Sequence, residues 1–135
     1  MVTKQEAAAQ QIDVAIRVLR DGHLCAAITL SCAGANCVPG GSALWEKMKD
    51  VYDATPAEKT DKAADWLNAP ANWLKHSGGG TNGAEDFDIN KKEAIINVWR
   101  GIATYAKVYG TDQLTSLMEC FMRRDWQDFA RACEG

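Results

Sequence analysis

The sequence predicts an all-α fold, a compact bundle of about six helices that forms one domain over residues 1–135. Apolar residues recur three and four positions apart in several long segments, which is the spacing of one helix face. Residues that typically start a helix precede these segments. No segment alternates polar and apolar residues with period two, so the chain offers nothing from which to build a sheet. Its length is the common size of a single domain.

The first helix is expected to begin after Thr3. Thr3 and Glu6 have the spacing of a capping box, in which each side chain accepts a hydrogen bond from the other residue's backbone N–H. Gly22 is expected to end this helix. Its apolar stripe consists of Ile12, Ile16 and Leu19. Residues 23–38 are rich in small side chains and predict a short buried helix that ends near Gly34. Such side chains let a neighbouring helix approach closely. A strand is the alternative, which is disfavoured because β-branched residues are scarce.

Two further helix starts follow. A turn is expected through residues 39–41, after which Ser42 can cap a third helix. Thr55 followed by Pro56 is another start signal, because proline is well tolerated at the first helical position. The helix that they open is expected to run to about Asn68.

Pro70 is expected to restart a short helical turn that runs through His76. Residues 77–88 contain several glycines and predict a loop. Asn90 and Glu93 then repeat the capping-box pattern with asparagine as the cap. The helix that follows has the broadest apolar stripe of the chain, which indicates a central position. That stripe consists of Ile95, Trp99, Ile102, Ala106 and Tyr109, and it is widened by Ile96, Val98 and Ala103.

The C-terminal part predicts two more helices. Gly110 is expected to end the central helix, and Thr111 to cap the next one. This helix presents Leu114, Leu117, Met118 and Phe121. Asp125 is expected to cap a last short helix, which carries Trp126, Phe129 and Cys133.

Composition limits the classes of partner. The net charge of −3 leaves no basic stripe of the kind that tracks duplex nucleic acid. Five cysteines without a CxxC motif indicate reduced thiols and a cytoplasmic location. The N-terminus has no signal-peptide pattern, and no apolar run approaches the roughly 18 residues of a membrane span. Five tryptophans in one small domain must be buried or covered by a partner, which favours a homodimer through an aromatic-rich face.

Two sequence motifs resemble known binding sites, but the residues around them do not meet the requirements of those sites. Residues 78–83 match GxGxxG, but a dinucleotide site needs a strand before the glycines and a helix directly after them. Residues 86–90 open like a calcium loop, yet Lys91 and Asn97 stand where glycine and glutamate are required. No Gly-x-Ser-x-Gly motif occurs, and no cysteine has an evident histidine partner in the sequence. We therefore predict no catalytic residue, no cofactor and no metal ligand.

The candidate binding site is the polar segment around His76. Asn72 and His76 are four residues apart and share a helix face, with Lys75 beside them. Asp86 or Asp88 can return across the loop to hold the imidazole. The alternative is a solvated or capping histidine without a ligand. The partner of this site is a small molecule or a protein that the sequence does not identify.

Residues 66–76 also carry a resemblance. They read W-L-x-x-P-x-N-x-x-K-H, the pattern of a set of small bacterial helical proteins, in which an acidic loop and a long apolar helix follow. This chain is similar over most of its length, with Ile28 where members have a histidine. The resemblance implies a bacterial helical bundle. A weaker one is to the HEPN class, whose dimeric nucleases share R-N-x-x-x-H; Asn72 and His76 match, and Ala71 takes the arginine position.

Two functions follow from these observations. The first is a binding or interaction module with a polar site near Asn72 and His76. The second, which the HEPN resemblance implies, is a ribonuclease or nucleotide-binding domain with His76 as general acid–base. The low basic charge and Ala71 favour the binding module.

Overall fold

The computed structural model describes residues 1–41, 63–75, 86 and 88–134, and within them every regular element is a helix. The all-α prediction is confirmed. The elements are α1 (Lys4–Arg20), α2 (Leu24–Cys37), α4 (Ala63–Lys75), α5 (Lys91–Tyr109), the 3₁₀ turn η2 (Thr111–Gln113), α6 (Ser116–Arg123) and α7 (Asp125–Glu134). The helix expected from Ser42, the start at Thr55 and most of the loop at 77–88 lie outside the described residues.

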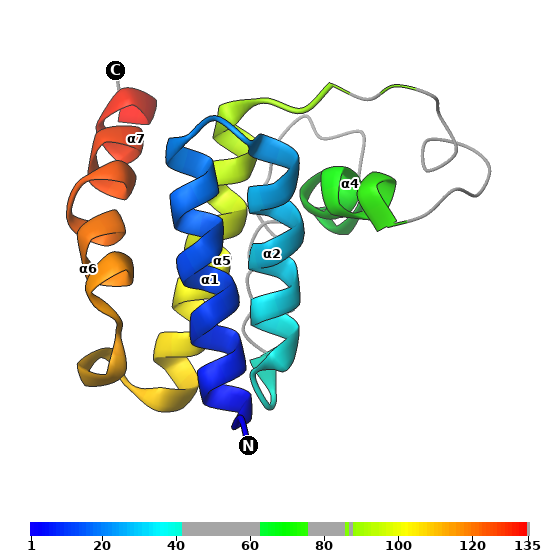
Figure 1. Ribbon diagram of the computed structural model, residues 1–135. Coiled ribbons are helices and arrows are strands. Elements are labelled where there is room, and N and C mark those ends of the chain that lie inside the picture. The colour runs from blue at the N-terminus through cyan, green and yellow to red at the C-terminus, as the bar shows by residue number, and fades with distance from the viewer. Residues whose placement is uncertain (42–62, 76–85, 87, 135) are drawn as a thin grey trace.

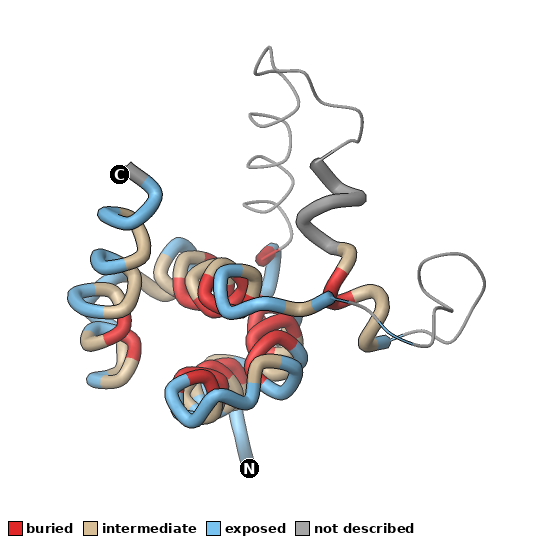
Figure 2. Tube along the Cα trace, turned by 90° about the horizontal axis from the view of Figure 1, so that it is seen from above, coloured by how far each residue is buried: buried red, intermediate tan, exposed pale blue. Residues whose placement is uncertain are grey.

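Helices α1, α2 and α5 form the core, with α2 and α5 running opposite to α1 (Figure 1). Seen along their axes, the buried residues of the three helices face one another (Figure 2). Helices α6 and α7 lie along one side of this core, and α4 lies on the opposite side against α2. None of the described helices is long and apolar enough to cross a membrane.

Ile12 lies at the centre of the core, completely buried. A Cβ atom added at Gly34 of α2 would lie 2.7 Å from its Cγ1, and one added at Gly101 of α5 would lie 3.4 Å from the same atom. Two glycines on two helices thus make room for one isoleucine on the third. The expected close approach of a neighbour to the small-residue helix is confirmed, and Ile12 is the side chain that uses it.

Both predicted capping boxes are present. Thr3 Oγ1 accepts a hydrogen bond from the Glu6 N–H at 3.1 Å, and Glu6 Oε2 accepts one from the Thr3 N–H at 3.4 Å. Asn90 Oδ1 accepts from the Glu93 N–H at 3.0 Å, and Glu93 Oε2 from the Asn90 N–H at 2.9 Å. Gly110 follows α5 with φ at +98°, a conformation that side chains with a Cβ rarely adopt.

Two predicted helix ends were wrong. Helix α2 continues beyond Gly34 to Cys37, because Gly34 serves close packing and Gly40, at φ +70°, makes the turn. Helix α4 runs without interruption through Pro70, where a break was expected. Proline removes one backbone hydrogen bond from a helix. Pro70 and its neighbour Ala71 are buried, and this packing offsets the loss.

The predicted start of α6 was also wrong. Thr111 begins the 3₁₀ turn η2, and the N-cap of α6 is Thr115. Thr115 Oγ1 accepts from the Met118 N–H at 3.1 Å and donates to Asp13 Oδ1 of α1 at 2.6 Å. The contact with α1 therefore decides where the helix begins. Asp125 is the first residue of α7 and not its cap.

Helix α5 is central as predicted, and Ile95, Val98 and Ile102 of the expected stripe are buried, but other members of the stripe are not. Trp99, Ala106 and Tyr109 are only partly buried. The buried positions are Ala94, Ile95, Asn97, Val98, Gly101, Ile102, Thr104 and Tyr105. Small residues in this set allow the three core helices to approach, which a count of large apolar residues does not detect.

Candidate functional site

The residues of the expected polar site are only partly described. Asn72 and Lys75 lie in the last turns of α4, half-buried and exposed respectively. Asp86 and Asp88 are exposed and precede α5. His76 lies outside the described residues. The grouping of these five residues around an imidazole stays a prediction.

Lys75 lies close to a polar contact between α2 and α5. The buried Cys32 Sγ donates to Asn97 Oδ1 at 3.4 Å, and Arg100 Nη1 donates to the same sulfur at 3.9 Å. Burial raises the pKa of the Cys32 thiol, and the charges of Arg100 and Lys75 oppose this effect only in part. Cys32 is therefore a neutral thiol at neutral pH, and the contact joins two core helices.

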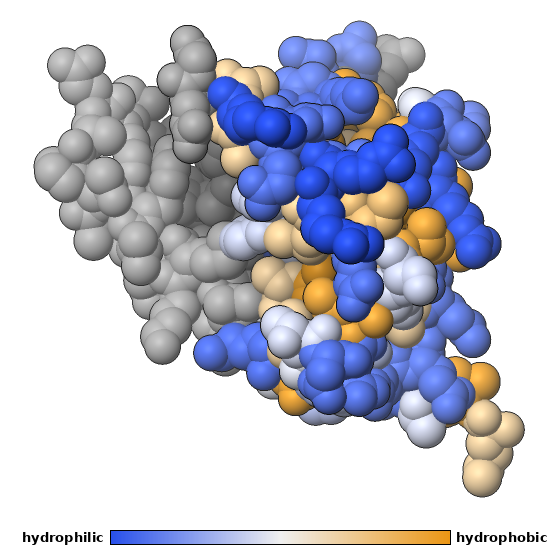
Figure 3. Space-filling model, turned by 90° about the vertical axis from the view of Figure 1, so that its left-hand side faces the viewer, coloured by the Kyte–Doolittle hydropathy of each residue, from blue (hydrophilic) through white to orange (hydrophobic). Residues whose placement is uncertain are grey.

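A pocket of about 330 Å³ opens at the other side of the core. The C-terminal end of α1, the first turns of α5 and the first turns of α7 enclose it, and we call it the α1–α5–α7 pocket. It is lined by Leu19, Arg20, Lys91, Ile95, Asp125, Asp128 and Phe129. Its volume is at the lower end of the range for small-molecule sites. Figure 3 views the molecule from the side of α6 and α7, where hydrophilic residues surround exposed parts of hydrophobic ones.

Aromatic stacking holds α7 in the position that closes the pocket. Trp126 of α7 stacks on Trp99 of α5, with ring centroids 5.0 Å apart and planes 14° apart. Phe129 packs against Trp126 at 5.3 Å and forms part of the pocket wall. Two of the five tryptophans are thus used within the chain itself.

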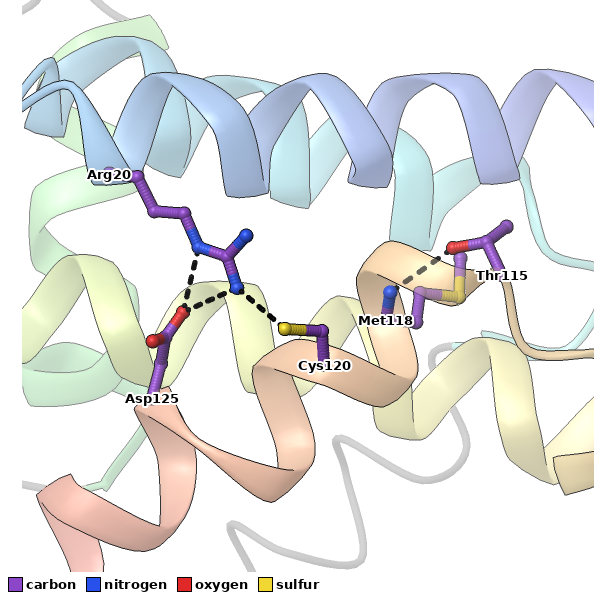
Figure 4. A network of polar contacts seen from close by, with 5 residues as sticks. All are labelled: Arg20, Thr115, Met118, Cys120 and Asp125. Carbon is purple, nitrogen blue, oxygen red and sulfur yellow. Dashed lines mark hydrogen bonds and ion pairs between the residues drawn. The ribbon is translucent and has the colours of Figure 1, made fainter.

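Arg20 joins three helices beside the pocket, in a cluster that we call the Arg20 network. Its Nε donates to Asp125 Oδ2 of α7 at 3.2 Å, and its Nη2 donates to Cys120 Sγ of α6 at 3.4 Å. Figure 4 shows the guanidinium between the carboxylate and the sulfur. Arg20 and Asp125 are about one third exposed, at 35% and 30%. The network is therefore reached from solvent.

The charged side chains of the pocket differ in whether they form an ion pair with another described residue. Asp125 pairs with Arg20, and Asp128 pairs with Arg131 in the next turn of α7. Lys91 makes no ion pair with any residue that the structure describes. A lysine in the first turn also opposes the helix dipole, so the stability of α5 gives no reason for a cation here. The pocket therefore combines an apolar wall with the cation of Lys91, for which the described part of the chain provides no ion-pair partner.

The Cys120 thiol differs electrostatically from that of Cys32. The hydrogen bond from Arg20 lowers its pKa, burial opposes this, and the charges of Arg20 and Arg124 lower it further. The position of Cys120 next to a guanidinium, and not its spacing in the sequence, produces this environment.

Sequence reasoning did not identify the pocket. Leu19 was predicted on the apolar stripe of the first helix, and Phe129 on the last helix with Asp125 as its cap. Lys91 served to reject a calcium loop. The residues come from three helix ends far apart in the chain, and no pattern within one helix signals that they meet. The one local signal is the basic pair Lys91 and Lys92 in the first turn of a helix, where acidic residues are usual.

Among the described residues, no group of three or more histidine, cysteine or acidic side chains is arranged to hold a metal ion. Comparison of the chain with protein-family models, with curated proteins and with solved structures finds no match.

Proposed function

We propose that the chain is a binding module that holds a small organic anion, such as an aromatic or aliphatic carboxylate, in the α1–α5–α7 pocket. The observation that carries the proposal is the presence, in one cavity of about 330 Å³, of an apolar wall and of Lys91, which forms no ion pair with a described residue. Sites for small molecules typically combine apolar surface with polar groups that orient the ligand. Leu19, Ile95 and Phe129 supply the apolar surface here, and four charged side chains complete the lining.

The apolar part of the ligand would contact Leu19, Ile95 and Phe129. Burial of apolar surface supplies about 25 cal/mol per Å² and is the main source of affinity for such a ligand. The charged part selects for an anion, because both pocket carboxylates, on Asp125 and Asp128, already have arginine partners. A cationic ligand would therefore meet carboxylates whose negative charge an arginine already compensates in part.

Binding is tested by calorimetry with benzoate and hexanoate as probes, and with benzylamine as the cation of similar size. We expect the carboxylates to bind and the amine not to bind. Lys91→Gln should weaken carboxylate binding about tenfold or more, the effect of removing a charged hydrogen-bond partner. Lys92→Gln is the matched control, since Lys92 is exposed in the same turn but does not line the pocket. Equal binding by the Lys91 and Lys92 variants, or stronger binding of the amine, contradicts the proposal.

We also retain as a proposal the polar site of Asn72, Lys75, His76, Asp86 and Asp88, together with the homodimer. Its support is the exposure of Lys75, Asp86 and Asp88, which leaves their charges accessible to a partner. The pairing of Trp99 with Trp126 inside one chain reduces the aromatic surface that a dimer would have to cover.

The enzyme alternative is decided by incubation of structured RNA with the protein and its His76→Ala variant. As a binding module, neither is expected to cleave RNA, and the thermal midpoint of the variant should remain nearly unchanged. Cleavage by the unaltered chain that is lost in His76→Ala would instead establish a ribonuclease of the HEPN type, with the imidazole as general acid–base.

A further inference from the structure

Cys120 is a half-buried cysteine whose sulfur lies next to the partly exposed guanidinium of Arg20. Cys25 and Cys133 are exposed, while Cys32 is buried. Cys37 is half-buried, and its thiol donates a hydrogen bond to the neutral amide oxygen of Gln11 at 3.9 Å. The Cys120 sulfur, by contrast, accepts a hydrogen bond from the Arg20 guanidinium at 3.4 Å.

This environment favours the reactive form of the thiol. The thiolate is the nucleophile in thiol–disulfide exchange, and a neighbouring guanidinium stabilises it relative to the thiol. Arg20 provides the hydrogen bond, and Arg124, which follows α6, adds a second positive charge. Asp125 faces the same guanidinium and keeps it in place through its Nε. Arg20 is only one third exposed, so it is held beside the sulfur and not free in solvent.

We propose that Cys120 is a site of modification by small disulfides, and that its modification weakens ligand binding in the α1–α5–α7 pocket. The Cys120 thiolate attacks one sulfur of a disulfide RSSR. A new sulfur–sulfur bond forms, the original one breaks, and RS⁻ leaves with the electron pair, so the exchange needs no further oxidant.

The Arg20 network connects this reaction to the pocket. Arg20 and Asp125 both line the pocket, and the same guanidinium contacts Cys120. A mixed disulfide fills the space beside the sulfur, and its sulfur carries no negative charge for Arg20 to stabilise. The guanidinium then has to move, and the ion pair between α1 and α7 at the pocket wall moves with it. This second part of the inference rests on the proposed function, whereas the reactivity of Cys120 does not.

The reactivity is measured with 4,4′-dithiodipyridine, whose released thiopyridone is followed by absorbance. The background is Cys25→Ser, Cys37→Ser and Cys133→Ser, which leaves Cys120 and the buried Cys32. We expect one rapid equivalent near neutral pH, and none after the further change Cys120→Ser. Arg20→Gln should slow the rapid phase at least about threefold near pH 7, and the difference should disappear near pH 10, where an unperturbed thiol is also ionised.

Arg17→Gln is the matched control, because Arg17 is an exposed cation in the last turn of the same helix with no contact to Cys120 in the structure. It should react at the rate of the background protein. The reactivity is overturned if Cys120→Ser keeps the rapid equivalent, or if Arg20→Gln and Arg17→Gln react equally fast near neutral pH. Helical content, measured by circular dichroism, identifies a variant that fails to fold; the Cys120→Ser comparison then still decides.

The connection to the pocket is measured by benzoate binding to the background protein before and after modification. We expect at least about threefold weaker binding after modification, restored by a reducing thiol, and no change in Cys120→Ser treated in the same way. Unchanged affinity in the modified protein overturns the connection. Absence of benzoate binding to the unmodified protein refutes the proposed function instead, and the kinetics of Cys120 still test its reactivity.

Discussion

Replacement of Ile12 by alanine is expected to lower the free energy of unfolding by about 2–5 kcal/mol, the usual cost of a large-to-small change in a packed core. Ile12 is completely buried, and both glycines of the neighbouring helices pack against its side chain. The backbones of α2 and α5 are already close to α1 here, so they have little freedom to move inward and fill the cavity. The measurement is urea unfolding followed by circular dichroism.

Val14→Ala is the control for this change. Val14 lies on the same helix but is 41% exposed, so its truncation creates no cavity and should cost no more than about 0.5 kcal/mol. Similar losses for the two variants would mean that the helix surface and not the core centre determines stability, contrary to the packing described above.

Gly34→Ala is expected to destabilise the chain by about 1–3 kcal/mol, although alanine is a better helix former than glycine by nearly 1 kcal/mol. The new Cβ would lie 2.7 Å from Ile12 Cγ1 and 3.2 Å from the backbone oxygen of Ala8. At these distances the buried side chain of Ile12 or the backbone of α1 has to shift. Urea unfolding measures the loss, and an increase in stability would show that the two helices separate without cost.

The double variant with Ile12→Ala and Gly34→Ala tests whether the two effects share one origin. The new methyl group at position 34 would occupy part of the space that the isoleucine vacates. The double variant should therefore lose at least about 1 kcal/mol less than the sum of the single losses, as expected for residues in direct contact. Strict additivity would contradict the contact between the two positions.

Much of the fold follows from local chemistry. The capping boxes at Thr3 and at Asn90 are each formed by residues three positions apart. Both helix starts therefore depend on a few consecutive residues only. The end of α5 at Gly110 is local in the same way. These features need no information about the neighbours of a helix.

The helix boundaries that were predicted wrongly lie at residues that contact another helix. Thr115 and not Thr111 caps α6, because Thr115 also bonds Asp13 of α1. Gly34 packs against Ile12 and so does not end its helix. In each case the local signal allowed two outcomes, and a contact from a distant part of the chain selected one of them.

The same difference between local signals and distant contacts separates the two candidate sites. The sequence by itself determined the helical class and two capped helix starts, while the polar site around Asn72 and Lys75 stays a prediction. Only the tertiary structure decided that Arg20, Lys91 and Asp125 meet beside a pocket. The physical reason is range: a helix cap depends on hydrogen bonds within one turn, whereas a pocket depends on how three separate helix ends pack, which the α7 aromatic stack on α5 determines.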